Sequence, residues 1–181
     1  GRSSRLLHRF MGDMFMLQRN AFLFQELVDH PGQRQRLFTE FRNDLDYIRD
    51  HSADARVEEL LAACRKSLRE LVHRIEKVRV DQARILRHLS PVIGKDNIFV
   101  DPFNLTAHIT DATDWRMFLP VAVLRPDHED QVPGIIREVE RLGFNLIPRG
   151  AGTGLTGGAT PLTGSCVMLN TEKLNHIIGI E

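Results

Sequence analysis

Residues 148–158 set the architecture of the C-terminal part of this chain, and they read Pro148-Arg149-Gly150-Ala151-Gly152-Thr153-Gly154-Leu155-Thr156-Gly157-Gly158. Five glycines fall within nine positions, directly after an apolar run at residues 144–147 that predicts a β-strand. Glycine lets backbone N–H groups approach an anion closely, and successive inward amides form a nest for phosphate oxygens. Thr153 and Thr156 add hydroxyl donors, and no lysine or arginine follows Arg149 inside the segment. The segment therefore predicts a loop that holds a diphosphate along its length, mainly through backbone amides.

This glycine loop differs from two familiar glycine motifs. A nucleoside-triphosphatase loop needs a lysine after its last glycine, whereas alanine and threonine follow the glycine pair here. Residues 152–157 contain G-x-G-x-x-G, which opens a helix in Rossmann domains, but Pro161 and Gly164 disfavour a long helix at this place. The next apolar run, residues 166–169, predicts another strand. A Rossmann-type nucleotide site stays open as an alternative, as do glycines that only form tight turns.

From Leu119 onward the sequence resembles the first half of a FAD-binding domain of the p-cresol methylhydroxylase/vanillyl-alcohol oxidase type. Among members of that group it looks most like D-lactate and glycolate dehydrogenase-like flavoproteins. An upstream approach segment, residues 111–114, also resembles that group. The resemblance rests on the order of the elements as well as on the glycines. The segments that carry it are residues 120–126, 146–154, 157–161, 167–170 and 174–181.

The resemblance implies that the glycine loop cradles the FAD diphosphate. The implied cofactor-binding residues are Pro148, Arg149, Gly150, Ala151, Gly152, Thr153, Gly154, Thr156, Gly157 and Gly158. Some members of the family attach FAD covalently through a histidine at the position that Thr153 occupies here, so the threonine implies non-covalent FAD. Two roles stay open for Arg149, because arginine either pairs with a phosphate or anchors the loop from outside equally well.

Composition excludes several classes of protein. The 181 residues carry 24 basic and 24 acidic side chains, so no strong field attracts nucleic acid or acidic lipid. Cys64 and Cys166 stand far apart, which argues against a disulfide scaffold, and no metal-ligand spacing is present. The most apolar stretch, residues 10–27, is interrupted by polar side chains and predicts no membrane span. A reducing cytoplasm is the expected location.

Residues 1–90 predict a helical domain. Apolar residues recur at helical spacing over residues 4–28, 33–49 and 53–89, with breaks at His30-Pro31 and at His51-Ser52. Ser52 is the expected N-cap of the third helix. A fold of the α+β class follows, with this α-helical bundle or hairpin ahead of the first α/β subdomain of a FAD-binding domain.

The third helical segment carries a heptad pattern. Apolar residues repeat every seven positions in two interleaved series, interrupted by one polar residue at Gln82. The members are Val57, Leu61, Cys64, Leu68, Leu71, Ile75, Val78, Ile85 and Leu89. The pattern fits either a homodimer through residues 57–89 or an intramolecular bundle, and short connections between the helices favour the bundle.

Ser90-Pro91 and Gly94 predict the boundary of the helical domain, with a linker and approach segment over residues 91–118 and the FAD-type part over residues 119–181. Strands are expected at residues 97–100, 121–124, 145–148, 166–169 and 177–180. A helix over residues 127–142 joins the second and third strands, which should therefore be parallel. This helix either begins near Pro133 or bends there, and Gly143 ends it.

No catalytic constellation is present in the sequence. His108, Asp111 and Asp114 lie close together, but their spacing favours turn or capping roles over metal or acid–base chemistry. The resemblance implies that the catalytic residues, the 2-hydroxy-acid site and any iron–sulfur cluster lie beyond Glu181, so that this chain is an inactive part of a longer oxidoreductase. A helical interaction or dimerisation module with a non-functional glycine loop is the alternative.

Overall fold

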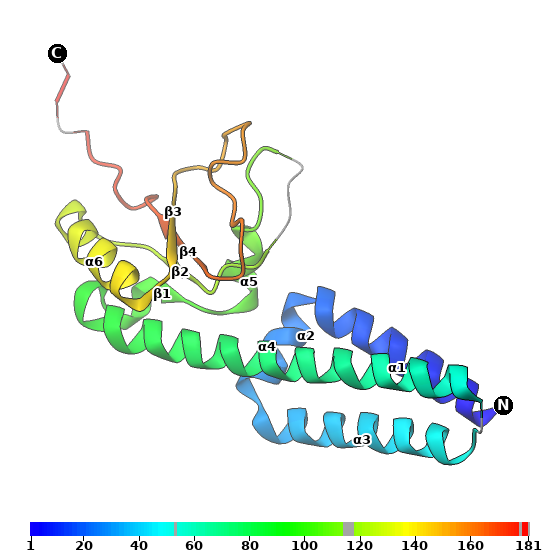
Figure 1. Cartoon of the computed structure of the whole chain (residues 1–181). Helices are drawn as coiled ribbons and strands as arrows, with labels where there is room; N and C mark the ends of the chain where they lie inside the picture. The colour runs from blue at the N-terminus through cyan, green and yellow to red at the C-terminus, as the bar shows by residue number, and fades with distance from the viewer. Residues whose placement is uncertain (53, 114–117, 178, 181) are drawn as a thin grey trace. The chain divides into compact units, whose positions relative to one another are not determined.

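The computed structural model of the chain describes residues 1–52, 54–113, 118–177 and 179–180. The chain divides into two compact units, Gly1–Arg79 and Val80–Glu181, which are described separately below. The division falls within one continuous helix, α4 (Ala55–Ile93), which contributes its first part to unit 1 and its last part to unit 2 (Figure 1).

Unit 1 is a bundle of α1 (Arg2–Arg19), α2 (Ala21–Asp29), α3 (Pro31–Asp50) and the first part of α4. The heptad residues of α4 share one apolar cluster with side chains of the three other helices, and Phe10 meets Phe41 edge to face at 5.2 Å between ring centres. The heptad members in this cluster are Leu61, Cys64, Leu68, Leu71 and Ile75. The seam is therefore covered within one chain, as the bundle interpretation expects.

The first helical segment breaks at Asn20, where a single helix over residues 4–28 was expected. The Asn20 side chain accepts hydrogen bonds from the backbone N–H groups of Phe22 at 3.0 Å and Leu23 at 3.2 Å. Its own backbone is extended, with ψ of 107°. Asparagine thus caps α2, because its short amide satisfies N–H groups that a new helix leaves unpaired.

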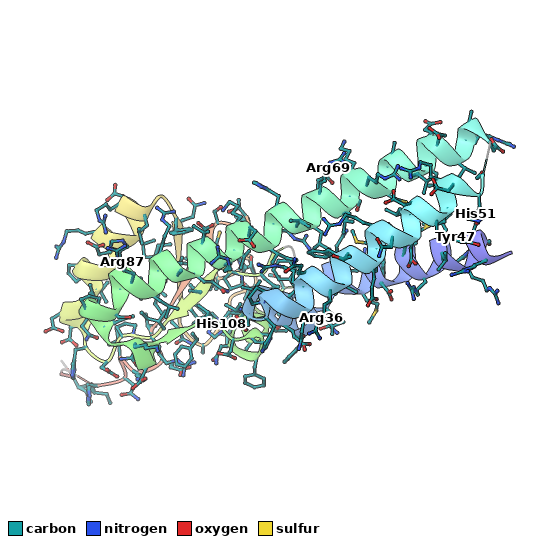
Figure 2. The ribbon with its side chains drawn as sticks, turned by 90° about the horizontal axis from the view of Figure 1, so that it is seen from below. Arg36, Tyr47, His51, Arg69, Arg87 and His108 are labelled. Atoms are coloured by element: carbon teal, nitrogen blue, oxygen red, sulfur yellow. The ribbon has the colours of Figure 1, made fainter. Side chains whose placement is uncertain are left out.

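The start of α4 also differs from the expectation. Asp54 rather than Ser52 provides the capping oxygen, since its carboxylate accepts a hydrogen bond from the Arg56 N–H at 2.9 Å. At the C-terminal end of α3, the rings of Tyr47 and His51 stack with their centres 4.0 Å apart (Figure 2). Arg69 of α4 is exposed (Figure 2).

Unit 2 contains a four-stranded sheet in the order β1-β2-β4-β3. The strands are β1 (Ile98–Phe99), β2 (Ala122–Leu124), β3 (Asn145–Arg149) and β4 (Cys166–Asn170). β4 lies between β2 and β3 and is parallel to both, whereas β1 is antiparallel to β2. The two strands of the predicted β-α-β unit are thus parallel, but they are not neighbours.

The side chains of the central strands alternate between two apolar layers. Ala122, Leu124, Val167 and Leu169 pack on one face with the last turns of α4 and with α6 (Val132–Leu142). Val123 and Met168 pack on the other face with Leu105 of α5 (Pro102–Ala107). The parallel strands are therefore buried on both faces, which matches their continuous apolar sequences.

α4 continues past the boundary that Pro91 predicts. Proline removes one helical hydrogen bond, but Pro91 lies in the last turn, and the helix ends only at Gly94. The extra turn buries Ile93 in the core under the sheet, which offsets the lost bond. The expected linker likewise contains α5, whose N-cap is Asp101.

Other expectations in unit 2 have mixed outcomes. The proposed start near Pro133 is confirmed, because α6 begins at Val132 after a short 3-10 turn, η2 (Glu129–Gln131). A second 3-10 turn, η1 (Lys95–Asn97), leads into β1. Gly143 follows α6 as expected. The strand expected at residues 177–180 is wrong for its described residues, which are exposed and pair with no other strand of the described chain.

Candidate functional site

The glycine loop begins at the carboxyl end of β3. Because β2, β4 and β3 are parallel, their carboxyl ends lie on the same side of the sheet, where Arg125 follows β2 and Asn170 ends β4. The Arg149 carbonyl that starts the loop accepts a hydrogen bond from the Thr171 N–H at 2.9 Å. Ligands of open parallel sheets bind at the carboxyl ends of the strands, so the loop occupies the expected edge for a cofactor.

The backbone amides of the loop are free of internal partners. Within the described residues, no N–H group from Ala151 to Gly158 donates a hydrogen bond to a protein acceptor. Internal bonding resumes with the N–H groups of Ala159 and Thr160. Thr153 and Thr156 are exposed, so their hydroxyls add to the same set of donors. A run of unpaired N–H groups in a glycine-rich loop is what an anionic ligand requires.

Two of the five loop glycines are explained by the fold. Gly152 has φ of +69° and Gly157 has φ of +74°, a backbone region in which other residues are strained. In addition, a Cβ on Gly152 would lie 2.3 Å from Nη2 of Arg149, closer than any real contact.

The other three glycines have no such explanation. Gly150, Gly154 and Gly158 lie outside the positive-φ region, and a Cβ on each would meet nothing closer than 3.8 Å. The described part of the chain therefore leaves room for a Cβ at all three positions. Bare backbone at these places is useful only if something outside the described chain approaches it closely.

Arg149 anchors the glycine loop through hydrogen bonds to backbone carbonyls. Its guanidinium donates hydrogen bonds from Nη1 to the Thr110 carbonyl at 2.7 Å and to the Ala159 carbonyl at 3.3 Å. These bonds tie the end of β3 to the approach segment and to the far end of the loop. The geometry favours the anchoring role for Arg149, while its positive charge still lies next to the free amides.

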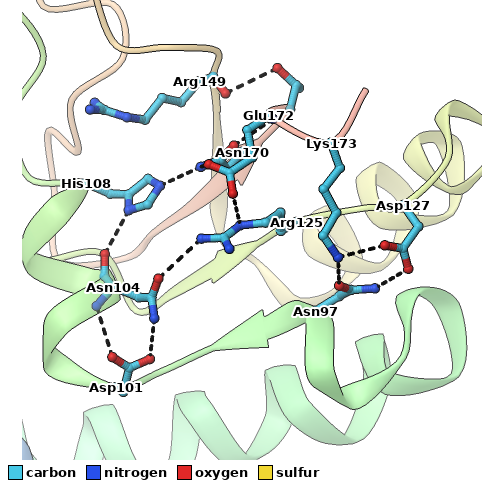
Figure 3. A network of polar contacts seen from close by, with 11 residues as sticks. Asn97, Asp101, Asn104, His108, Arg125, Asp127, Arg149, Asn170, Glu172 and Lys173 are labelled. Carbon is cyan, nitrogen blue, oxygen red and sulfur yellow. Dashed lines mark hydrogen bonds and ion pairs between the residues drawn. The ribbon is translucent and has the colours of Figure 1, made fainter. Parts of the chain in front are cut away.

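A polar network joins the strand ends beside the loop (Figure 3). His108 is buried, and its Nε2 accepts a hydrogen bond from the Asn170 side-chain amide at 2.9 Å. Its Nδ1 lies 2.8 Å from the Asn104 carbonyl. Burial lowers the pKa of His108, and Arg149 and Arg125 lower it further, against the backbone bond to Asn104 and Glu172, which raise it. The ring is therefore neutral and carries its proton on Nδ1.

The same network fixes the segment after β4. Glu172 pairs with Arg125 at 2.9 Å, and Arg125 also donates to the Asn104 side chain at 3.3 Å. Lys173 bridges Asn97 at 2.6 Å and Asp127 at 2.7 Å. Asp127 therefore holds the segment after β4, and the neighbouring residue His128 is the N-cap of η2.

The predicted site residues lie together at one place. Pro148 and Arg149 belong to β3, and the remaining eight form the loop that follows it. Sequence reasoning missed the contact between the loop and Asp111, which accepts a hydrogen bond from the Ala159 N–H at 3.5 Å. The Asp111 side chain accepts a hydrogen bond from the Thr113 N–H and so forms a turn, as predicted. The turn-forming residues were the signal in the sequence that this segment has a defined structure. Asp114 lies outside the described residues.

Neither metal chemistry nor a disulfide is supported. No group of three or more histidine, cysteine or acidic residues converges among the described residues, and both cysteines are buried and free. A hollow of about 920 Å³ beside α6 and β3, lined by apolar residues such as Ile136 and Leu162, includes none of the loop residues 150–158. No helix within the described ranges combines the length and apolar character that a bilayer crossing needs.

Comparisons with known families match the two ends of the chain separately. Residues 120–181 match a family described as a FAD binding domain. Residues 1–73 match a family described as a protein of unknown function (DUF3683). The match over residues 120–181 confirms the resemblance of the C-terminal region to a FAD-binding domain.

Curated relatives are glycolate oxidase subunits. The chain is 29% identical to glycolate oxidase subunit GlcD of Bacillus subtilis (strain 168) over 97 residues, which cover 54% of this chain and 20% of the relative. It is 39% identical to the GlcD subunit of Escherichia coli (strain K12) over 62 residues, 34% of this chain and 12% of the relative. The chain thus spans a fifth or less of these proteins.

Two solved structures are similar to part of this chain. p-Cresol methylhydroxylase with substrate bound superposes with a TM-score of 0.49 at 20% identity. 4-Ethylphenol oxidase from Gulosibacter chungangensis, in its isoeugenol complex, has a TM-score of 0.48 at 25% identity. Each comparison covers 56% of this chain and 20% of the solved one.

Proposed function

We propose that the glycine loop binds the diphosphate of FAD without a covalent bond. The observation that carries this proposal is the trio Gly150, Gly154 and Gly158, where the fold leaves room for a Cβ and the backbone is nevertheless bare. The free amides from Ala151 to Gly158 supply the donors, and Thr153 offers a hydroxyl in place of an attachment residue.

The cofactor and the residues of this chain have different roles in this proposal. Bound FAD supplies a hydride acceptor. The loop amides hold the diphosphate, Arg149 and the network around His108 keep the strand ends in place, and no residue of this chain is assigned a bond-breaking role.

For the whole protein we propose a FAD-linked dehydrogenase of 2-hydroxy acids such as D-lactate or glycolate. The support is the name of the curated relatives, which are glycolate oxidase subunits. An iron–sulfur centre as electron acceptor and a cytoplasmic location belong to the same proposal, and the buried free cysteines agree with a reducing compartment.

The binding proposal is tested by equilibrium dialysis of the 181-residue chain against FAD, FMN and riboflavin. Only FAD carries a diphosphate, so FAD should bind at least about tenfold more tightly than riboflavin, a difference of about 1.4 kcal/mol. Equal affinity for the three flavins would contradict a diphosphate site.

The substrate proposal needs the natural polypeptide in which this chain occurs. Anaerobic addition of D-lactate or glycolate should bleach the visible absorbance of its oxidised flavin, and L-lactate is the control. The isolated 181 residues should turn over none of these acids. Failure of both acids to bleach a fully flavin-loaded protein would remove the 2-hydroxy-acid assignment.

The homodimer through residues 57–89 remains a second proposal. Its support is the exposure of two apolar side chains of α4, Leu60 at 39% and Val80 at 45%. Leu60 and Val80 lie on different faces of α4, so each position tests a different dimer contact. Sedimentation of Leu60→Asp and Val80→Asp tests the proposal, because a homodimer should dissociate in the variant whose side chain it buries.

A further inference from the structure

The approach segment contacts the glycine loop at two points. The Ala112 N–H donates a hydrogen bond to the Gly154 carbonyl at 3.2 Å, and the Ala159 N–H donates to Oδ2 of Asp111 at 3.5 Å. The same Oδ2 lies 3.8 Å from the position of a Cβ on Gly154. Residues that precede the loop by some forty positions thus hold both the middle and the far end of it.

Asp111 is itself held rigidly. Its Oδ1 accepts hydrogen bonds from the Thr113 N–H at 2.9 Å and the Thr113 hydroxyl at 2.6 Å. The Thr110 hydroxyl donates to the Thr113 carbonyl at 2.9 Å, and the Thr110 carbonyl accepts from Arg149. The Thr113 hydroxyl holds the pKa of Asp111 below its usual range, and the Thr113 and Ala159 amides act in the same direction. The side chain is therefore a fixed, charged acceptor.

A carboxylate beside a diphosphate site calls for an explanation, because like charges repel. Two unit charges 4 Å apart cost about 1 kcal/mol even in water. The contacts of Asp111 offer a gain that outweighs this repulsion, because they hold Ala159 at the end of a loop whose amides, at residues 151–158, have no partner among the described residues.

We infer that Asp111 is a positioning residue for the flavin diphosphate. It holds Ala159, at the end of the glycine loop, so that the loop keeps the shape in which the N–H groups of residues 151–158 can bind the ligand. The inference rests on the proposed function of the loop. Asp111 does not touch the ligand in this account. It acts through Ala159, while the neighbouring Ala112 N–H holds the Gly154 carbonyl.

The decisive variant is Asp111→Asn, which keeps the size of the side chain and removes its charge. If Asp111 were only an unfavourable neighbour of the diphosphate, the variant would bind FAD more tightly. If Asp111 positions the loop, FAD affinity should fall about tenfold, as expected for a lost hydrogen bond to a charged acceptor. Riboflavin affinity should not change, which separates loop geometry from general damage. Asp130→Asn, at an exposed acidic position, controls for net charge.

A second readout does not depend on any ligand. Amide hydrogen exchange of the flavin-free chain should accelerate at Ala159 and Thr160 in Asp111→Asn, and less strongly in the milder variant Thr113→Val. Unchanged exchange, or FAD affinity equal to or above that of the wild type, would overturn the inference. If the wild-type chain fails to bind FAD, the proposed function fails, and the exchange rates alone still decide whether Asp111 holds the loop.

Discussion

The guanidinium of Arg149 occupies the space where a side chain on Gly152 would begin. A Cβ on Gly152 would lie 2.3 Å from Nη2 and 2.5 Å from Cζ of Arg149. Arg149 also donates to two carbonyl groups that flank the loop. The loop is thus built around an arginine, and the glycine at position 152 is part of that construction.

Gly152→Ala should therefore destabilise the flavin-free chain. The positive φ and the clash with Arg149 together should cost about 1 to 3 kcal/mol of the free energy of unfolding, measured by denaturant titration. Gly158→Ala is the matched control, because it has room for a Cβ and should change stability by less than about 0.5 kcal/mol. Equal losses in the two variants would contradict both the backbone strain at Gly152 and its close contact with Arg149.

Ile75→Ala should destabilise unit 1 without changing the molecular mass in solution. Ile75 is fully buried in the core that the heptad residues of α4 share with α1–α3. Leucine and isoleucine truncations at such positions cost about 2 to 5 kcal/mol. Thermal unfolding and sedimentation of the same sample provide the measurements. A stable variant that dissociates from a dimer would instead assign the seam to an intermolecular contact.

Local patterns predicted most helices and strands because apolar periodicity reports which face of an element is buried. The pattern could not show the order β1-β2-β4-β3, since strand order depends on contacts between residues distant in sequence. Asn20 and Asp101 carried readable signals, because both are favoured N-cap residues, and Asp101 precedes a proline.

The candidate site was also predictable from the sequence only in part. The glycine loop was visible as a motif, whereas its fastening by Asp111 and Arg149 joins residues about forty positions apart. The sequence also could not separate glycines that the backbone requires from glycines that it does not. That distinction depends on φ and on the neighbours of each Cβ, which only the fold provides.

His108 should make stability depend on pH near neutrality. Because burial lowers its pKa in the folded state, the contribution of His108 is fully present above the ordinary histidine value of 6.5 and is lost as pH falls below it. In addition, a proton on Nε2 would face the Asn170 amide donor. His108→Gln should flatten the dependence of the unfolding free energy on pH below neutrality, whereas His176→Gln, at an exposed position, should not. An identical pH slope in wild type and His108→Gln would refute this role.

Thr153 should leave the flavin free to dissociate. Threonine has no nucleophilic ring nitrogen, and the resemblance implies that Thr153 stands where some members of the family carry an attachment histidine. Acid precipitation of the FAD-loaded chain should release all flavin into the supernatant. Yellow colour that stays with the precipitated protein after washing would rule out non-covalent binding.

The most direct test of the central claim compares FAD affinity in Gly150→Asp and Gly150→Asn. The nearest atom to a Cβ on Gly150 is the Thr171 hydroxyl oxygen at 4.0 Å, so both variants have room for the Cβ, and their side chains are of nearly equal size and differ mainly in charge. If the loop holds the diphosphate, the aspartate variant should bind FAD at least about tenfold more weakly than the asparagine variant, or about 1.4 kcal/mol. Riboflavin affinity and melting temperature should match between the two. Equal FAD affinity in the two variants would show that the diphosphate does not lie in the glycine loop.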